Sequence, residues 1–128
     1  MRVYYEDTDA GGVVYYANYL RFLERARTEW LRQLGFDQEA LIRDSGILFA
    51  VRRVTIDYLL PARLDDSLLV EARVAEPGRV SLTFDQRIRR GAEVLVQASV
   101  QVVCLDSRRF RPVAIPGVIL ERIADAQH

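Results

Sequence analysis

The sequence predicts an α+β fold in which one antiparallel sheet packs against one long helix. Apolar residues recur at helical spacing through residues 16–34, and beyond Gly46 the pattern changes to the alternation that is typical of strands. The chain has 128 residues, 50% of them hydrophobic, and no break in composition. We therefore expect one domain that covers residues 1–128.

The helix predicted over residues 16–34 has one apolar side. Arg25 and Glu29 lie four residues apart on its polar side and are able to pair across one turn, and Gly35 suits a left-handed C-terminal cap. A second, shorter helix is predicted over residues 38–44. The apolar positions of the long helix are Tyr19, Leu23, Ala26, Trp30 and Leu34, widened by Leu20, Phe22 and Leu31.

Three stretches of alternating apolar and polar residues predict successive antiparallel strands. Hairpin turns are expected between them at Pro77-Gly78 and Arg90-Gly91. One face of this sheet should be buried against the helix, and the other should be largely exposed to water. The strands are expected at residues 68–74, 80–88 and 94–104.

A further strand is predicted over residues 47–58, where the apolar pattern slips by one residue. This slip predicts a β-bulge near residues 52–53, and bulges often direct side chains toward sites. Leu69, Val103 and Leu105 fall on the face that should be exposed to water. Because joining the sheets of two subunits would partly protect these side chains and a free strand edge, we expect a dimer.

Composition excludes several classes of function. Eighteen basic residues balance eighteen acidic ones, which gives no reason to expect nucleic acid or a membrane surface as a partner. All basic residues are arginines, so Schiff-base, pyridoxal and P-loop lysine chemistry are excluded. No intrachain disulfide is possible with Cys104 alone, and no apolar run is long enough for a signal peptide or a membrane span. We expect a cytoplasmic protein.

Histidine and cysteine usage narrows the chemistry further. The single histidine is His128, the last residue, which we interpret as a tail group rather than a triad base or metal ligand. Serine, cysteine and zinc hydrolase mechanisms are therefore not expected, because each usually requires a histidine. Cys104 lies in an apolar row and is predicted to be a core residue.

Residues 4–15 are the most informative segment, because acidic residues and two glycines stand directly before the long helix. A helix N-terminus is able to bind an anion or to stabilise negative charge on a carbonyl oxygen, so a carboxylate beside it would suit acyl chemistry. Asp7 and Asp9 do not begin an EF-hand, because Gly11 and Asn18 occupy two of its ligand positions. Two interpretations remain open for these aspartates: turn or helix-cap residues, or catalysis.

Separate blocks of the sequence carry a family resemblance: residues 2–15, continued by Asn18-Tyr19 and residues 24–29, then residues 53–58, and residues 61–66. They closely resemble the hot-dog acyl-CoA thioesterases associated with the Tol-Pal system, within the 4-hydroxybenzoyl-CoA thioesterase superfamily. The resemblance spans nearly the whole chain. It implies a hot-dog fold, in which an antiparallel β-sheet wraps around one long central α-helix, and homodimers or homotetramers with sites at the subunit interface. The family usually has several residues before this first run, so we expect a trimmed or misassigned N-terminus.

The resemblance also implies site residues. The second aspartate of the family's D-x-D motif carries catalysis and falls on Asp9, which would either attack the thioester carbonyl or activate water. The family polarises the thioester oxygen with the backbone N–H that aligns with Tyr16. The Tol-Pal branch usually has histidine at this position, whereas tyrosine resembles the hydroxybenzoyl-CoA branch. Tyr5 matches a family tyrosine that positions the catalytic aspartate or the acyl group.

The resemblance also implies substrate-binding residues outside the segment that contains Asp9. Arg79, followed by Ser81, matches part of the basic cluster that the aromatic-acyl branch places against the coenzyme A phosphates. Arg53, at the predicted bulge, is expected to reach across the subunit interface. No metal or redox cofactor is implied.

We therefore expect a thioesterase that hydrolyses a short-chain aliphatic or aromatic acyl-CoA to a carboxylic acid and free coenzyme A. Chains bound to acyl carrier protein remain open as substrates. The rival hypothesis is a non-catalytic module that binds acyl-CoA or acyl carrier protein, as an adaptor of an envelope or lipid-synthesis complex. The presence of Asp9 favours the enzyme.

Overall fold

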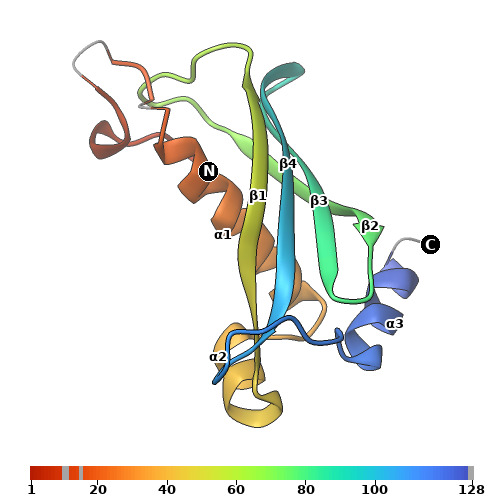
Figure 1. The fold of residues 1–128 in the computed structure, drawn as a ribbon. Helices are drawn as coiled ribbons and strands as arrows, with labels where there is room; N and C mark the ends of the chain where they lie inside the picture. Colours follow the sequence, from red (N-terminus) through yellow and green to blue (C-terminus); the bar gives the residue numbers. More distant parts are fainter. Residues whose placement is uncertain (10–11, 15, 127–128) are drawn as a thin grey trace.

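The computed structural model describes residues 1–9, 12–14 and 16–126. One antiparallel sheet, in the strand order β1-β4-β3-β2, has the long helix α1 lying across one face (Figure 1). This arrangement confirms the predicted α+β class. The elements are η1 (Tyr5–Asp7), α1 (Asn18–Gln33), α2 (Gln38–Ala40), η2 (Leu41–Ser45), β1 (Ile47–Tyr58), β2 (Leu69–Pro77), β3 (Ser81–Arg90), β4 (Glu93–Asp106) and α3 (Gly117–Ala126).

The apolar side of α1 is buried against the sheet. Leu23 is fully buried, and the ring of Trp30 meets the ring of Phe84 on β3 edge to face, with centroids 5.0 Å apart. Gln86 on β3 is also fully buried, and it donates to the carbonyl oxygen of Leu23 at 3.0 Å and accepts from Arg27 at 2.9 Å. Because a buried amide without partners costs free energy, these bonds favour one position of α1 along the sheet.

Glycines in the left-handed region follow both predicted helices. Gly35 follows α1 with φ +94°, close to the predicted end of the helix. Asp37 then caps α2, its carboxylate accepting from two backbone N–H groups. The second predicted helix, residues 38–44, is present, but its C-terminal part is the π-helical turn η2, which ends at Gly46 with φ +67°.

The predicted strands and bulge are confirmed. The register of β1 against β4 shifts between Val51 and Arg53, as the slip in the apolar pattern predicted. The turns at Pro77-Gly78 and Arg90-Gly91 join β2 to β3 and β3 to β4. The sequence therefore predicted the four strands and the bulge in β1, but not the register shifts between Val74 and Glu76 and between Ile88 and Arg89.

The helix α3 was not predicted. Pro116 stands directly before it, a common position for proline at a helix start. On its exposed side, Arg122 donates to the carbonyl oxygen of Leu34 at the end of α1, at 2.6 Å. The helix is thereby tied to the end of α1 and forms part of the core. Its buried residues are Ile119 and Ile123, and Ile115, two residues before the helix, is buried as well.

The prediction that Val103 faces water was wrong, because this side chain is only 8% exposed. After β4 the chain returns along the sheet, where Val113 donates to the Cys104 carbonyl at 2.9 Å and Ile115 donates to the Arg79 carbonyl at 2.8 Å. This end of the sheet therefore has an additional segment paired with it. Leu69, by contrast, is 54% exposed, as predicted.

The segment between β1 and β2 is anchored by Asp66. Its carboxylate accepts from the backbone N–H of Arg63 at 2.8 Å and from the guanidinium of Arg90, at the end of β3, at 2.7 Å. Burial by itself would raise the pKa of Asp66, but these two donors outweigh it and hold the pKa below its ordinary value. The ionised form therefore stabilises the folded state.

This anchor predicts a specific acid sensitivity. A carboxylate whose pKa is lowered on folding contributes stability above its unfolded-state pKa, near 4, and loses that contribution as pH falls through the folded-state pKa. We expect Asp66→Asn to lower the free energy of unfolding by about 1 kcal/mol at pH 6 and to flatten its decline below about pH 4. Urea unfolding between pH 6 and pH 2.5 measures both effects.

Arg90→Gln provides the matched control, because it removes the other member of the ion pair. The double variant should lose less stability than the sum of the two single variants. Parallel decline of Asp66→Asn and wild-type stability with falling pH would contradict the assignment.

Candidate active site

A short hairpin carries Asp9 just before the start of α1. The backbone N–H of Asp9 donates to the Val13 carbonyl at 2.9 Å, and the Asp9 carbonyl accepts from Gly12 at 3.1 Å. Asp9 is exposed to solvent. The loop therefore holds its backbone and leaves the residue at the surface. Ala10, Gly11 and Tyr15, which belong to the same motif, lie outside the described residues.

Asp7 occupies a different environment, because it is only 5% exposed. Its carboxylate accepts from the backbone N–H of Tyr4 at 3.0 Å and lies 3.5 Å from the guanidinium of Arg21. Its carbonyl oxygen accepts from the side-chain amide of Asn18 at 2.9 Å. The turn interpretation therefore holds for Asp7, and catalysis by Asp9 stays a prediction.

Tyr16 lies two residues before Asn18, the first residue of α1, and is 60% exposed. Its carbonyl oxygen accepts from the backbone N–H of Tyr19 at 3.3 Å, and its ring meets Tyr58 of β1 edge to face, with centroids 6.1 Å apart. The N-cap residue, Ala17, makes no side-chain cap. The partial positive charge of the first turn is therefore not neutralised by its N-cap side chain.

Ala62 lies beneath the hairpin and is fully buried. Its carbonyl oxygen accepts from Val14 at 2.8 Å, and its N–H donates to the hydroxyl of Tyr19 at 2.9 Å. Leu64 donates to the Gly12 carbonyl at 3.1 Å. Burial is the main cause that raises the pKa of Tyr19, so the hydroxyl is neutral near pH 7. The sequence blocks around residues 9 and 62 thus meet in one place.

Tyr5 is the first residue of η1, and Arg53 lies at the bulge of β1. The Tyr5 side chain is 81% exposed, and its carbonyl oxygen accepts from both the backbone and the hydroxyl of Thr8. Arg53 lines a shallow hollow of about 130 Å³ with Thr83 and Gln101 on β3 and β4. Their expected roles at the site stay predictions.

Arg79 and Ser81 lie at the end of the sheet opposite Asp9. Arg79 is in the β2–β3 turn, and Ser81 begins β3, a strand of ten residues. The other end of β3 is the Arg90 end, which contacts Asp66 near the hairpin. At about 3.3 Å per residue, roughly 30 Å separates the two ends (Figure 1). One chain alone therefore does not bring Arg79 and Asp9 together.

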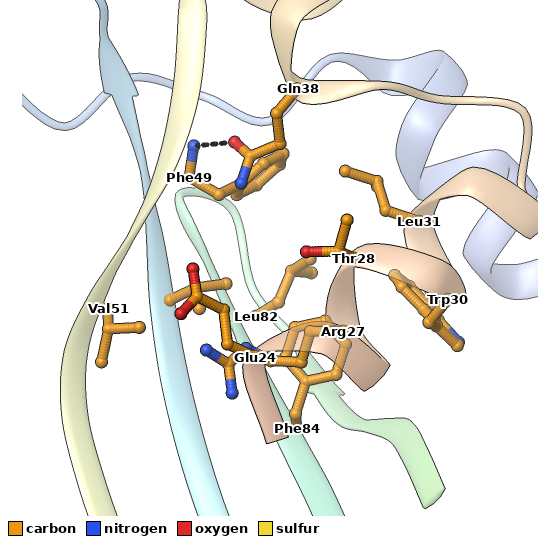
Figure 2. A pocket seen from close by; sticks show the side chains of 11 residues that line it. Glu24, Arg27, Thr28, Trp30, Leu31, Gln38, Phe49, Val51, Leu82 and Phe84 are labelled. Atoms are coloured by element: carbon orange, nitrogen blue, oxygen red, sulfur yellow. Dashed lines mark hydrogen bonds between the residues drawn. The ribbon is translucent and has the colours of Figure 1, made fainter. Parts of the chain in front are cut away.

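A pocket of about 180 Å³ opens between α1 and the sheet. Figure 2 shows Glu24 and Arg27 of α1 toward one end of the pocket and Gln38 toward the other, where Gln38 accepts from the backbone N–H of Phe49 at 3.2 Å. Thr28 adds a hydroxyl from α1. The remaining lining residues are apolar: Trp30, Leu31, Phe49, Val51, Leu82, Phe84 and Val102.

The sequence pattern did not predict this pocket. Glu24 and Thr28 are polar positions of α1, and polarity alone does not predict a neighbouring cavity. Their spacing of four residues does place them on one face of the helix, one turn apart. Arg27 lies on the same side of α1, and burial lowers the pKa of its guanidinium. This spacing was the available signal.

The other candidates for chemistry are few. Cys104 is fully buried in the core, as predicted, and burial raises the pKa of its thiol. Across residues 1–9, 12–14 and 16–126, no cluster of three or more histidine, cysteine or acidic side chains is arranged to hold a metal ion. In the same part of the chain, no helix has the length and hydrophobicity needed to cross a membrane. His128 lies outside the described residues.

Comparisons with known proteins match this chain in sequence and in fold. The family model described as "Thioesterase superfamily" matches residues 11–97. The chain is 50% identical over 116 residues to acyl-CoA thioesterase YbgC of Haemophilus influenzae, covering 91% of this chain and 85% of that protein. The crystal structure of a probable thioesterase from Bartonella henselae matches with a TM-score of 0.85 and 36% identity, covering 91% of this chain and 95% of that one.

A second solved structure extends the match to the whole chain. The 1,4-dihydroxy-2-naphthoyl-CoA thioesterase from Synechocystis has a TM-score of 0.90 and 25% identity, covering 100% of this chain and 95% of that one. These matches confirm the hot-dog fold that the resemblance predicted. The family match covers most of the chain, and the H. influenzae relative matches nearly all of it. The chain belongs to the thioesterase superfamily.

Proposed function

We propose that this protein hydrolyses an acyl-CoA thioester to a carboxylic acid and free coenzyme A. The observation that carries the proposal is the difference in exposure between the two aspartates: Asp7 is 5% exposed, whereas Asp9 is exposed on the hairpin that precedes α1. The name of the H. influenzae relative, acyl-CoA thioesterase, supports the same substrate class.

The proposed mechanism uses two elements of the site. The Asp9 carboxylate either removes a proton from water as it attacks the carbonyl carbon, or attacks that carbon itself and is then released by water. The N–H at Tyr16 donates to the carbonyl oxygen as negative charge develops there. On either route the carbon–sulfur bond breaks as the tetrahedral intermediate collapses, on the covalent route before water cleaves the acyl–Asp9 anhydride, and the coenzyme A thiolate takes up a proton. The net reaction consumes one water molecule.

The pocket between α1 and the sheet supports a small acyl group. Its volume of about 180 Å³ is below the range of about 300–1,000 Å³ that is common for sites holding drug-sized ligands. Its walls are mostly apolar, with polar side chains from Glu24, Arg27 and Thr28. A short aliphatic chain or a single aromatic ring fits this size, so we propose these as the acyl groups.

We propose that the working unit is a dimer joined through β1. This strand forms one edge of the sheet over twelve residues, and Val51, Val54 and Tyr58 on it are exposed. Antiparallel pairing with the β1 strand of a second copy would continue the sheet and satisfy the open edge. The twofold axis would also bring the Arg79 end of one subunit toward the Asp9 end of the other.

The remaining expectations are proposals of the same kind. They comprise one thioesterase domain over residues 1–128, pairing of dimers into tetramers, acyl carrier protein as an alternative carrier of the acyl group, a cytoplasmic location, and association with the Tol-Pal system. In this proposal Tyr5 positions Asp9 or the acyl group. Arg79 and Ser81 hold the coenzyme A phosphates, and Arg53 acts across the interface.

Replacing Asp9 tests the catalytic proposal. Asp9→Asn keeps the size of the side chain but removes its basicity, so kcat should fall by about 10²- to 10⁴-fold. Release of free thiol from a panel of short-chain and aromatic acyl-CoAs measures the change. Asp125→Asn, an exposed position on α3, is the matched control and should retain the wild-type rate.

Equal thiol release by Asp9→Asn and wild type would remove Asp9 from the mechanism. Absence of thiol release from both proteins, with acyl-CoA binding retained, would favour the non-catalytic binding module instead.

A mixed dimer tests whether two subunits share each site. Arg79→Ala should raise KM in a salt-sensitive way, because a phosphate contact is lost. In a dimer of one Asp9→Asn chain and one Arg79→Ala chain, one of the two sites would combine an intact Asp9 with an intact Arg79. Activity should therefore recover to about half of the wild-type value per dimer at low substrate concentration.

The two chains carry different affinity tags, so that only mixed dimers are purified. A dimer in which both chains carry Asp9→Asn is the control and should stay inactive. Failure of the mixed dimer to exceed the two parent dimers would contradict a shared site.

A further inference from the structure

We propose that Asn18 and Tyr19 are positioning residues, which hold the two arms of the Asp9 hairpin against the first turn of α1. The inference rests on the proposed function, because it explains how Asp9 is kept in place relative to the helix start. Neither side chain needs to touch the substrate for this role. Each acts through a hydrogen bond to backbone on one side of the hairpin.

Asn18 holds the arm that enters the hairpin. It is the first residue of α1 and is half-buried, and its side-chain amide donates to the carbonyl oxygen of Asp7 at 2.9 Å. Asp7 stands two residues before Asp9, and Asn18 stands two residues after Tyr16. One hydrogen bond therefore spans the two elements that the proposed reaction requires.

Tyr19 holds the arm that leaves the hairpin. Its side chain is only 3% exposed, and its hydroxyl accepts from the N–H of Ala62 at 2.9 Å. The carbonyl of Ala62 in turn accepts from Val14 at 2.8 Å. The ring is fixed by Phe22 and Tyr58, with centroids 6.1 and 5.6 Å away. The hydroxyl thus acts on the hairpin through one buried peptide group.

Loss of the hydrogen bonds from Asn18 and Tyr19 should lower the rate of the chemical step more than the affinity for substrate. A reacting carboxylate must lie within about 3–3.5 Å of its target, and a displacement of about 1 Å is able to cost about 100-fold in rate. The hairpin also has its own backbone hydrogen bonds, from Asp9 to Val13 and from Gly12 to Asp9. Loss of the hydrogen bonds from Asn18 and Tyr19 should therefore shift the hairpin without unfolding it. We therefore expect kcat to change and KM to stay nearly constant.

The experiment compares Asn18→Ala, Tyr19→Phe and the double variant with wild type. Tyr19→Phe removes only the hydroxyl and keeps the packed ring. Each single variant should lower kcat by about tenfold, and the double variant by about 100-fold, with KM within about twofold of wild type. Tyr4→Phe is the matched control: it also removes one tyrosine hydroxyl, from a side chain that is 61% exposed, and it should not change kcat.

A merely structural role would give a different result. Rates are measured at 20 °C and corrected for the folded fraction from thermal melts. An unchanged corrected kcat, or a rise in KM that accounts for the lost kcat/KM, would overturn the proposal. A fall in the corrected kcat with constant KM supports it, because loss of position lowers the rate without weakening substrate binding.

Amide hydrogen exchange separates this inference from the proposed function. The amides of Asp9, Gly12 and Val14 should exchange faster in Asn18→Ala and Tyr19→Phe than in Tyr4→Phe. If wild type released no thiol from any acyl-CoA, the proposed function would fail, but amide exchange would still test whether Asn18 and Tyr19 position the hairpin. Faster exchange in Asn18→Ala and Tyr19→Phe would then support this positioning role, and unchanged exchange would overturn it.

Discussion

The peptide group of Ala62 is the constraint on which the site depends. Its N–H is bound by the Tyr19 hydroxyl of α1 and its carbonyl by the Val14 amide of the hairpin, all in a position with no solvent exposure. Moving a buried peptide whose N–H and carbonyl are both hydrogen-bonded would break these bonds without water to replace them, so its position is strongly favoured. Asp66 holds the same segment to the end of β3 through Arg90. The sheet, the long helix and the Asp9 hairpin therefore meet around one short stretch of chain.

The two ends of the sheet carry different parts of the proposed site. One end holds the hairpin and the start of α1, while the other carries the β2–β3 turn and α3 (Figure 1). The pocket in Figure 2 lies between α1 and the open β1 edge, with Phe49 and Val51 of that strand in its lining. A second copy paired along β1 would bring unlike ends together, so the proposed dimer explains why the expected substrate contacts are distant within one chain.

Much of the fold was predictable because its signals are local. The period of α1, the alternation in β2, β3 and β4 and the slip near residues 52–53 each arise within a short window of sequence. Val103 and the pocket were not predictable in this way, because burial there depends on segments that return from elsewhere in the chain. The helix α3 did have a local signal, in Pro116 and in the four-residue spacing of Ile115, Ile119 and Ile123. Composition does not distinguish Asp7 from Asp9 as the catalytic candidate. In the structure they differ in burial and in hydrogen bonding, and in the sequence only the family resemblance favoured Asp9.

The central claim is that Asp9 and the start of α1 act on the same thioester carbonyl. A crystal structure with a non-hydrolysable acyl-CoA analogue, in which a ketone replaces the thioester, tests this claim most directly. The account predicts the Asp9 carboxylate within about 3–4 Å of the carbonyl carbon, or one water molecule away, with the carbonyl oxygen bonded to the N–H at Tyr16. An analogue whose carbonyl lies away from both groups, with Asp9 turned toward bulk solvent, would contradict it.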